Sequence, residues 1–146
     1  MSTISYPASF NIYKRSAAAQ FSIINPKVDS NGRISRNGAI LLEMAPSKGE
    51  KSYDWREQKL TFAFGINDIT QFFDDPNSSK WGSFFHQNDG TNKKLTISHG
   101  EGRYEGTFMM TLSSGDDRVS VSLSGGEFQV LGRLFTAALP KILGWS

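Results

Sequence analysis

The sequence predicts an α+β fold in which about four strands and a helix follow one another twice. Turn dipeptides divide most of the 146 residues into short stretches rich in aromatic and β-branched side chains, which are typical of strands. The last segment, Ser124 to Trp145, is the one long helical stretch. No strong residue-level repeat relates the two halves, so they share a plan and not a sequence.

The first half begins with an expected flexible segment at residues 1–10, and residues 11–146 are expected to form one domain. Turn and proline signals delimit three extended stretches, at Tyr13–Ile24, Ala39–Ala45 and Tyr53–Phe64. Asn25-Pro26 ends the first stretch, and Pro46 is expected to stop the second. Alternating apolar residues from Leu60 onward predict a half-buried strand.

A short helix is expected at Asn67–Phe73, before Asp74-Asp75-Pro76. Asn67 is the expected N-cap, and Asp68 lies in the first turn, where an acidic side chain is favourable. The second half then contains four expected strands, at Trp81–His86, Lys93–Ser98, Tyr104–Leu112 and Arg118–Leu123. Glycine-containing turns separate them.

The final helix is apolar over most of its circumference. Ser124 and Glu127 have the spacing of a capping box, and Pro140 is expected to end or kink the helix. Its apolar side chains spread over roughly 240°, whereas a helix packed on one sheet needs a stripe of little more than about 100°. We therefore expect a second apolar partner, which would be another copy of the chain.

Composition gives no support for an enzyme. The net charge is +2 and there is no cysteine, which excludes disulfides and thiolate chemistry. His86 and His99 have no second ligand at a recognisable spacing, so no metal site is expected. Phosphate-loop and nucleophile motifs are missing. We therefore expect no catalytic residue, no cofactor, no small-molecule substrate and no membrane partner.

Aromatic residues next to cations recur on the expected strands. Examples are Tyr13-Lys14-Arg15, Tyr53 to Lys59, and Phe84-Phe85-His86 followed by Lys93-Lys94. Single-stranded nucleic acid is bound by this combination, because bases stack on aromatic rings while cations neutralise phosphates. Ordinary strand alternation, with aromatic core residues and solvated charges, produces the same pattern.

The chain resembles the Whirly family. The apolar run Ile40–Ala45 with Pro46, then Tyr53-Asp54-Trp55, is similar to that family's signature, as are Phe84-Phe85-His86 and the ending Gly144-Trp145. The similarity covers nearly all of residues 11–145. It implies two packed four-stranded antiparallel sheets, each followed by helical elements, and a homotetramer assembled through the helices. It also implies single-stranded DNA binding with little sequence preference, in DNA maintenance, repair or transcription.

One motif departs from the family pattern. Lys-Gly-Lys-Ala-Ala-Leu is replaced by Lys14 to Ala19, in which Arg15 stands for glycine and Ser16 for the second lysine. That lysine is associated with higher-order stacking of tetramers. If this segment is a strand, Arg15 and Ser16 face opposite sides of it. Relatives act in mitochondria, plastids and the nucleus, so an intracellular site of that kind is expected.

The expected contacts follow from residue type. Phosphate contacts are assigned to Lys14, Arg15, Lys59, Lys93 and Lys94, with Ser16 at the variant motif position. Stacking or pocket walls are assigned to Tyr13, Tyr53, Trp55, Phe84 and Phe85, of which Trp55 or Phe85 is expected to be the first to prove a core residue. Polar base contacts are assigned to Gln58 and His86. Oligomerisation is assigned to Leu131, Leu134, Phe135, Ala138, Leu139 and Ile142.

Two alternatives remain open from the sequence. The first is an RNA-binding or RNA-annealing protein of the same architecture, because a stacking surface tolerates either sugar. The second is a β-rich protein-interaction module that binds no nucleic acid and oligomerises through its last helix.

Overall fold

The chain folds into two antiparallel sheets flanked by two helices, in a computed structural model that describes residues 8–74, 80–88 and 91–145. The first half comprises β1 (Ser9–Tyr13), β2 (Ala17–Ile24), β3 (Lys27–Val28), β4 (Ile34–Arg36), β5 (Ala39–Gly49), β6 (Ser52–Tyr53), β7 (Leu60–Phe64) and α1 (Ile66–Asp74). The second half comprises β8 (Lys80–Asn88), β9 (Thr91–His99), the 3-10 turn η1 (Gly102–Tyr104), β10 (Phe108–Ser114), β11 (Asp117–Leu123) and α2 (Gly125–Leu143).

The expected α+β architecture is confirmed. In the first sheet β1, β2, β5 and β7 lie side by side, and the short β6 pairs with the far end of β5. The second sheet has the order β11-β10-β9-β8. β3 and β4 form a separate two-stranded hairpin between β2 and β5.

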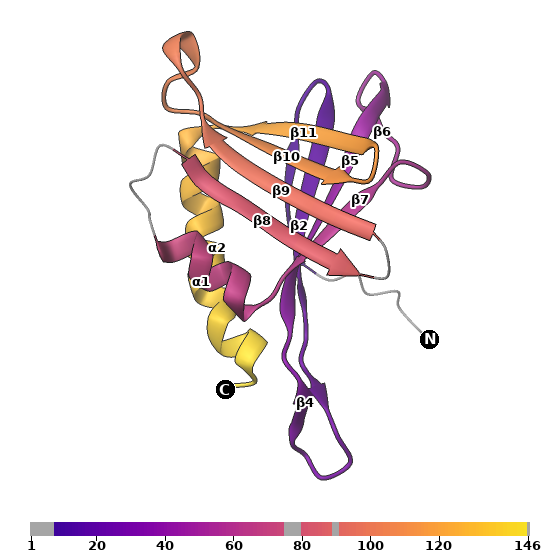
Figure 1. The fold of residues 1–146 in the computed structure, drawn as a ribbon, viewed down its shortest axis with the longest axis vertical. Coiled ribbons are helices and arrows are strands. Elements are labelled where there is room, and N and C mark those ends of the chain that lie inside the picture. The colour runs from indigo at the N-terminus through magenta and orange to yellow at the C-terminus, as the bar shows by residue number, and fades with distance from the viewer. Residues whose placement is uncertain (1–7, 75–79, 89–90, 146) are drawn as a thin grey trace.

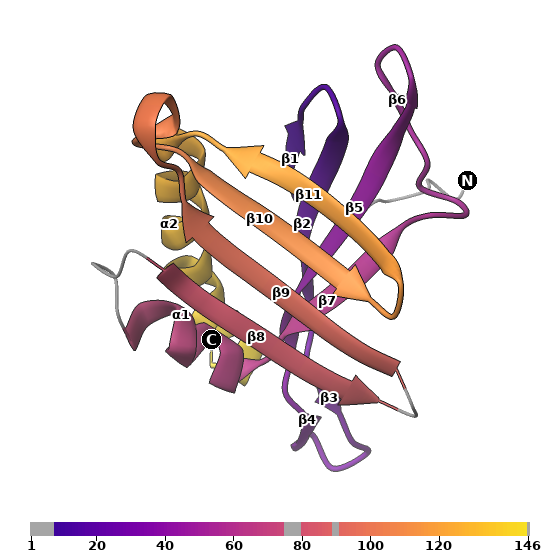
Figure 2. The same cartoon turned by 45° about the horizontal axis from the view of Figure 1, so that its top comes forward.

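The two sheets cross face to face, with β11 against β2 and β5 and β10 against β7 (Figures 1 and 2). Both helices lie on the same side of this pair, and α1 contacts α2, β7 and β8. In this arrangement the alternating apolar side chains of both sheets point into one shared core. The predicted alternation in β7 is confirmed, because Phe62 and Phe64 are buried there.

Phe135 of α2 lies where both helices meet the first sheet. Its ring centroid is 4.7 Å from that of Phe72 in α1, 5.1 Å from that of Phe64 in β7 and 6.4 Å from that of Phe21 in β2. Aromatic pairs at such distances add about 0.5–1.5 kcal/mol each beyond area burial. The ring therefore joins elements from both halves of the chain.

Some predicted boundaries were wrong. The stretch Tyr13–Ile24 contains the last residue of β1, a turn at residues 14–16 and β2, so Arg15 and Ser16 lie in the turn of a hairpin and not in a strand. The stretch Tyr53–Phe64 is likewise broken by a turn at residues 55–57. Tyr104 belongs to η1, and α1 begins at Ile66, so Asn67 is not its N-cap. Residues 1–7 lie outside the described residues, whereas Ser9 and Phe10 belong to β1 and not to a flexible segment.

Neither of two prolines ends its element. β5 continues through Pro46 because that residue faces the gap between β7 and β6, where no strand needs an N–H donor, and its carbonyl accepts a hydrogen bond from Asp54 N (2.9 Å). α2 continues through Pro140 to Leu143, and it ends at Gly144, a left-handed C-cap with φ of 76°. The predicted Ser124–Glu127 capping box is confirmed.

The β3–β4 arm, residues 24–38, extends from the end of β2 and β5 away from the body of the molecule (Figure 1). Its base is held by Gly38, whose N–H donates to the Ile142 carbonyl at the end of α2 (2.8 Å). A Cβ atom on Gly38 would lie 2.3 Å from the Ile24 carbonyl oxygen. Only glycine therefore fits at this point.

We predict that Gly38→Ala lowers the free energy of unfolding by about 1–3 kcal/mol, because the new methyl group must displace backbone. The matched control is Gly132→Ala in α2, where no atom lies within 4 Å of an added Cβ. Because alanine is the better helix former, the control should gain about 0.5–1 kcal/mol. Denaturant unfolding of both variants measures the difference, and equal effects at the two positions would contradict the packing at the arm's base.

Candidate nucleic-acid interface

Two aromatic rings predicted from the sequence lie side by side at the end of the first sheet that carries the β1–β2 turn. The ring centroids of Tyr13, at the end of β1, and Tyr53, in β6, are 5.8 Å apart, and Tyr13 is 59% exposed. They line an open groove with Trp55, Lys51 and Ser52. We call this set the tyrosine groove.

The continuation of β5 beyond Pro46 positions Tyr53. Ser47 of that continuation pairs with Tyr53, and the Tyr53 hydroxyl donates a hydrogen bond to the Lys14 carbonyl oxygen (2.6 Å). This bond, between residues 39 positions apart in the chain, ties β6 to the β1–β2 turn, so the two tyrosines meet at the same end of the sheet although they come from its opposite outer strands. The rings are thereby held in position before any ligand arrives.

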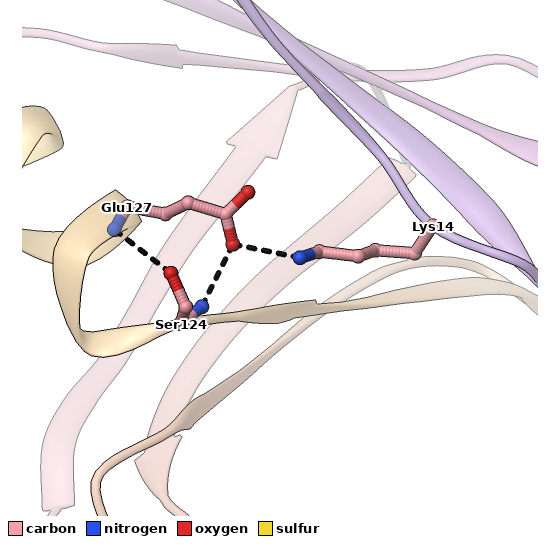
Figure 3. A network of polar contacts seen from close by, with 3 residues as sticks. All are labelled: Lys14, Ser124 and Glu127. Carbon is pink, nitrogen blue, oxygen red and sulfur yellow. Dashed lines mark hydrogen bonds and ion pairs between the residues drawn. The ribbon is translucent and has the colours of Figure 1, made fainter.

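Lys14 is held by an ion pair to α2. Its Nζ lies 2.8 Å from Glu127 Oε1, and the same oxygen accepts a hydrogen bond from the backbone N–H of Ser124 (Figure 3). The Ser124 hydroxyl in turn accepts from Glu127 N (3.0 Å). Lys14 therefore extends the capping box and links the β1–β2 turn to the helix. The exposed members of that turn are Arg15 and Ser16.

The charge state of Glu127 depends on this network. Burial acts to raise the pKa of Glu127, but hydrogen bonds from Lys14 and Ser124 and the positive charge of Lys14 outweigh it and lower the pKa below the ordinary value of 4.5. The carboxylate is therefore ionised near neutral pH, as a helix N-terminus favours.

The second sheet carries another aromatic–cation pair, on the face turned away from the core. Phe85 of β8 is 66% exposed and lies directly opposite Lys94 of β9. The Lys94 Nζ is 5.4 Å from the centre of the Phe85 ring. This pair offers a π-face and a positive charge together, on a sheet separate from the tyrosine groove.

Three other residues predicted to contact nucleic acid lie on the opposite face of this sheet from Phe85. They are Phe84 and His86 of β8 and Lys93 of β9. Phe84 is 1% exposed and packs edge-on against Phe62 and Phe64, so Phe84, and not Phe85, is the core residue. His86 stacks on Phe62 with ring centroids 4.0 Å apart. Strand alternation explains the difference, because adjacent residues face opposite sides.

Polar neighbours hold His86 and the remaining lysines of this region. His86 Nε2 is 2.9 Å from Asp68 Oδ2, and Lys93 Nζ donates to the Thr61 carbonyl oxygen (2.8 Å). Lys59 Nζ is 2.7 Å from Glu43 Oε2. Gln58 is exposed in the turn before β7, and Trp55 is half-buried.

Sequence reasoning missed the residues that complete these sites. Lys51 and Ser52 line the tyrosine groove, but Lys51 stands in a turn and Ser52 begins the two-residue strand β6, which is too short to carry a strand pattern. Asp68, Glu43 and Glu127 pair with side chains that were predicted to contact nucleic acid and that come from distant parts of the chain. Pairing between distant residues leaves no local signal in the sequence. Lys51 and Ser52 could have been found, because they directly precede Tyr53, a predicted site residue.

Most of the predicted oligomerisation residues pack inside the protomer. Leu131, Phe135, Ala138 and Ile142 are at most 4% exposed and belong to the core. Leu139 is half-buried, and Leu134 and Val130 are each 43% exposed. Leu134 also lines an apolar groove of about 220 Å³ between α2 and the β1–β2 edge. The exposed apolar surface of α2 is therefore narrower than the sequence suggested.

Within the described residues, no three His, Cys, Asp or Glu side chains gather in a way that could hold a metal ion. None of the helices described is both long and apolar enough to cross a membrane.

Comparisons with known proteins agree with the fold. Residues 12–134 match the family profile described as Whirly transcription factor. The mitochondrial single-stranded DNA-binding protein WHY2 of Arabidopsis thaliana is 31% identical, covering 95% of this chain and 64% of the relative, and the chloroplastic WHY1 of Solanum tuberosum is 26% identical, covering 93% and 54%. The chain thus spans about half to two thirds of these relatives.

Solved structures are similar over nearly the whole chain. The crystal structure of WHY3 from Arabidopsis thaliana superposes with a TM-score of 0.81 at 23% identity, covering 98% of this chain and 92% of the other. The plant transcriptional regulator PBF-2 gives a TM-score of 0.78 at 25% identity, covering 98% and 86%.

We predict that Glu127→Gln lowers the free energy of unfolding near neutral pH. The same change should make that free energy less dependent on pH in the acidic range. Because the pKa of Glu127 is lower in the folded chain, its contribution is present above the unfolded pKa and is lost as pH falls through the folded pKa. Thermal unfolding at about pH 7 and about pH 3 should show the variant approaching the unmodified chain at the lower pH. An equal deficit at both values would contradict the ion pair with Lys14.

Proposed function

The chain belongs to the Whirly family, and on this premise we propose that it binds single-stranded DNA with little sequence preference. The observation that carries the proposal is the tyrosine groove, where the Tyr13 and Tyr53 rings lie 5.8 Å apart at the end of the first sheet beside Trp55. Exposed rings stack on any base at about 1–3 kcal/mol per base. Curated relatives are named single-stranded DNA-binding proteins, which favours DNA over RNA as the ligand.

In this proposal both aromatic surfaces contribute stacking contacts to the DNA strand. Tyr13 and Tyr53 receive bases at the end of the first sheet, with Arg15 and Lys51 close by in the chain to neutralise phosphates. Phe85 and Lys94 provide a second stacking point on the outer face of the other sheet. Lys14, Lys59, Lys93 and His86 support the fold, because each has a polar partner within 3 Å.

We further propose a homotetramer assembled through the exposed part of α2. Support comes from Val130 and Leu134, two large apolar side chains that are each 43% exposed, and from the apolar groove beside Leu134. Repeating a groove of modest affinity in one assembly raises the overall affinity for a long strand. Binding of this kind requires no catalytic step and no cofactor.

The cellular role is proposed by analogy with the relatives. Those compared are named as mitochondrial or chloroplastic, and PBF-2 is described as a plant transcriptional regulator. We propose that the chain acts on organellar or nuclear DNA, in its maintenance, repair or transcription.

Tyr13→Ala is expected to weaken binding of an oligothymidine by about 5- to 150-fold, equivalent to losing one stacked base. Fluorescence anisotropy measures the affinity. Tyr104→Ala is the matched control, because Tyr104 is 55% exposed on η1, outside the groove. A Tyr13→Ala chain that binds like the control would count against the groove, and preference for an RNA oligomer of the same sequence in competition would favour the RNA alternative.

Leu134→Asp is expected to convert the assembly to soluble monomers and to weaken DNA binding, because it places a charge on the proposed interface. Light scattering coupled to gel filtration measures the mass. The control is Thr136→Asp, an exposed position on the polar side of the helix. The neighbouring Phe135 is unsuitable, since it is 1% exposed and its replacement would disturb the protomer. A soluble monomer with unchanged DNA affinity would disprove the link between assembly and binding.

A further inference from the structure

The β3–β4 arm carries three cations that the tyrosine groove does not use. Lys27, Arg33 and Arg36 are all exposed, and the arm contains one acidic residue, Asp29. Within the described part of the chain, no ion pair involves any of these three cations. The arm is therefore a local concentration of unneutralised positive charge.

Two of these cations face each other across the hairpin. Lys27 of β3 is paired directly with Arg36 of β4, and residues paired in this way project from the same face of a sheet. Like charges in that position destabilise a hairpin. An anion bound between or beside them would remove this repulsion.

Asp29 is occupied by the turn of the arm. Its Oδ1 accepts hydrogen bonds from the backbone N–H groups of Asn31 (2.9 Å) and Arg33 (3.0 Å). The carboxylate therefore shapes the turn and forms no ion pair with the side chains of Lys27 or Arg36. The charge on that face needs a partner from outside the arm.

Ile34 and the base of the arm lie against the C-terminal end of α2. Ile34, paired with Val28, lies against the helix end: a Cβ atom on Gly144 would be 2.6 Å from Ile34 Cδ1. The base is held by the hydrogen bond from Gly38 N to the Ile142 carbonyl. Val28 is 58% exposed, so the contact with the helix end comes from Ile34, and both members of the cationic pair are exposed to solvent.

We propose that the cationic face of the β3–β4 arm, formed by Lys27 and Arg36, is a second nucleic-acid contact that binds backbone phosphates and stacks no bases. The arm contains no aromatic residue, so it can neutralise charge but cannot hold a base. β2 separates it from the tyrosine groove by eight residues, which is roughly 25 Å of strand. It therefore takes a different stretch of the same strand, and this inference rests on the proposed single-stranded DNA binding.

A phosphate-only contact has a distinct thermodynamic signature. Each phosphate neutralised on a single strand contributes about 0.7 to the slope of log affinity against log salt. Lys27→Ala with Arg36→Ala should reduce that slope by about 1.4 for an oligothymidine of about 30 nucleotides. Tyr13→Ala should instead lower affinity at every salt concentration and leave the slope unchanged, because stacking releases no counterions.

The matched control removes the same charge elsewhere. Arg103→Ala with Arg133→Ala eliminates two exposed cations on η1 and α2, and it should leave the slope close to that of the unmodified chain. Circular dichroism and thermal unfolding verify that both double variants remain folded, as expected for exposed side chains.

Each outcome decides between the proposals. A reduced slope in the arm variant alone supports the inference. If the unmodified chain binds oligothymidine but the arm variant and the control have the same slope, the inference fails while the proposed function stands. If the unmodified chain does not bind oligothymidine, both fail. Loss of polyglutamate binding in the arm variant, with an unchanged oligothymidine slope, would assign the arm to an acidic protein partner and overturn the proposal.

Discussion

The buried stripe of α2 is the constraint on which the rest of the structure depends. Phe128, Leu131, Phe135, Ala138 and Ile142 enter the core formed by the two crossed sheets, and Phe135 alone has ring contacts with β2, β7 and α1. Because the sheets come from opposite halves of the chain, packing the last helix requires that both halves are already in place. Loss of the Phe135 ring would cost about 3–5 kcal/mol, a large share of the stability of a domain this size.

The same helix also organises the binding surfaces through its two ends. At its N-terminus, Glu127 holds Lys14 and thereby the β1–β2 turn, to which Tyr53 is bonded. At its C-terminus, the Ile142 carbonyl and Gly144 hold the base of the β3–β4 arm. A helix end has unpaired N–H or carbonyl groups. At the C-terminus the Gly38 N–H bonds one such carbonyl, whereas at the N-terminus the capping box meets an N–H group and Lys14 pairs with the carboxylate of that box. The proposed stacking groove and the proposed phosphate contact are thus supported by opposite ends of one rigid element.

Aromatic residues with different roles are adjacent in the sequence, and so are cationic residues. In each pair one side chain supports the fold and its neighbour is exposed. Phe84 is in the core while Phe85 is 66% exposed, and Lys93 is held by Thr61 while Lys94 lies over the Phe85 ring. Lys14 is paired and Arg15 is exposed. A modest net charge of +2 is therefore compatible with nucleic-acid binding, because exposed cations lie at the β1–β2 turn, on the outer face of the second sheet and on the arm.

The sequence by itself determined the fold class, the alternating strand that begins at Leu60, the capped C-terminal helix and the family, because these depend on periodicity, local capping and short motifs. It did not determine which members of each aromatic and cationic group were exposed. Three further features depend on which neighbour each backbone and side-chain group contacts. They are the positions of Phe84 and Phe85, the turn inside Tyr13–Ile24, and the continuation of β5 through Pro46. The pairing of Lys14 with Glu127, 113 residues apart, and the burial of four of the six expected interface residues of α2 have the same origin. Such long-range contacts leave no periodic signal in the chain, so only the tertiary structure decided them.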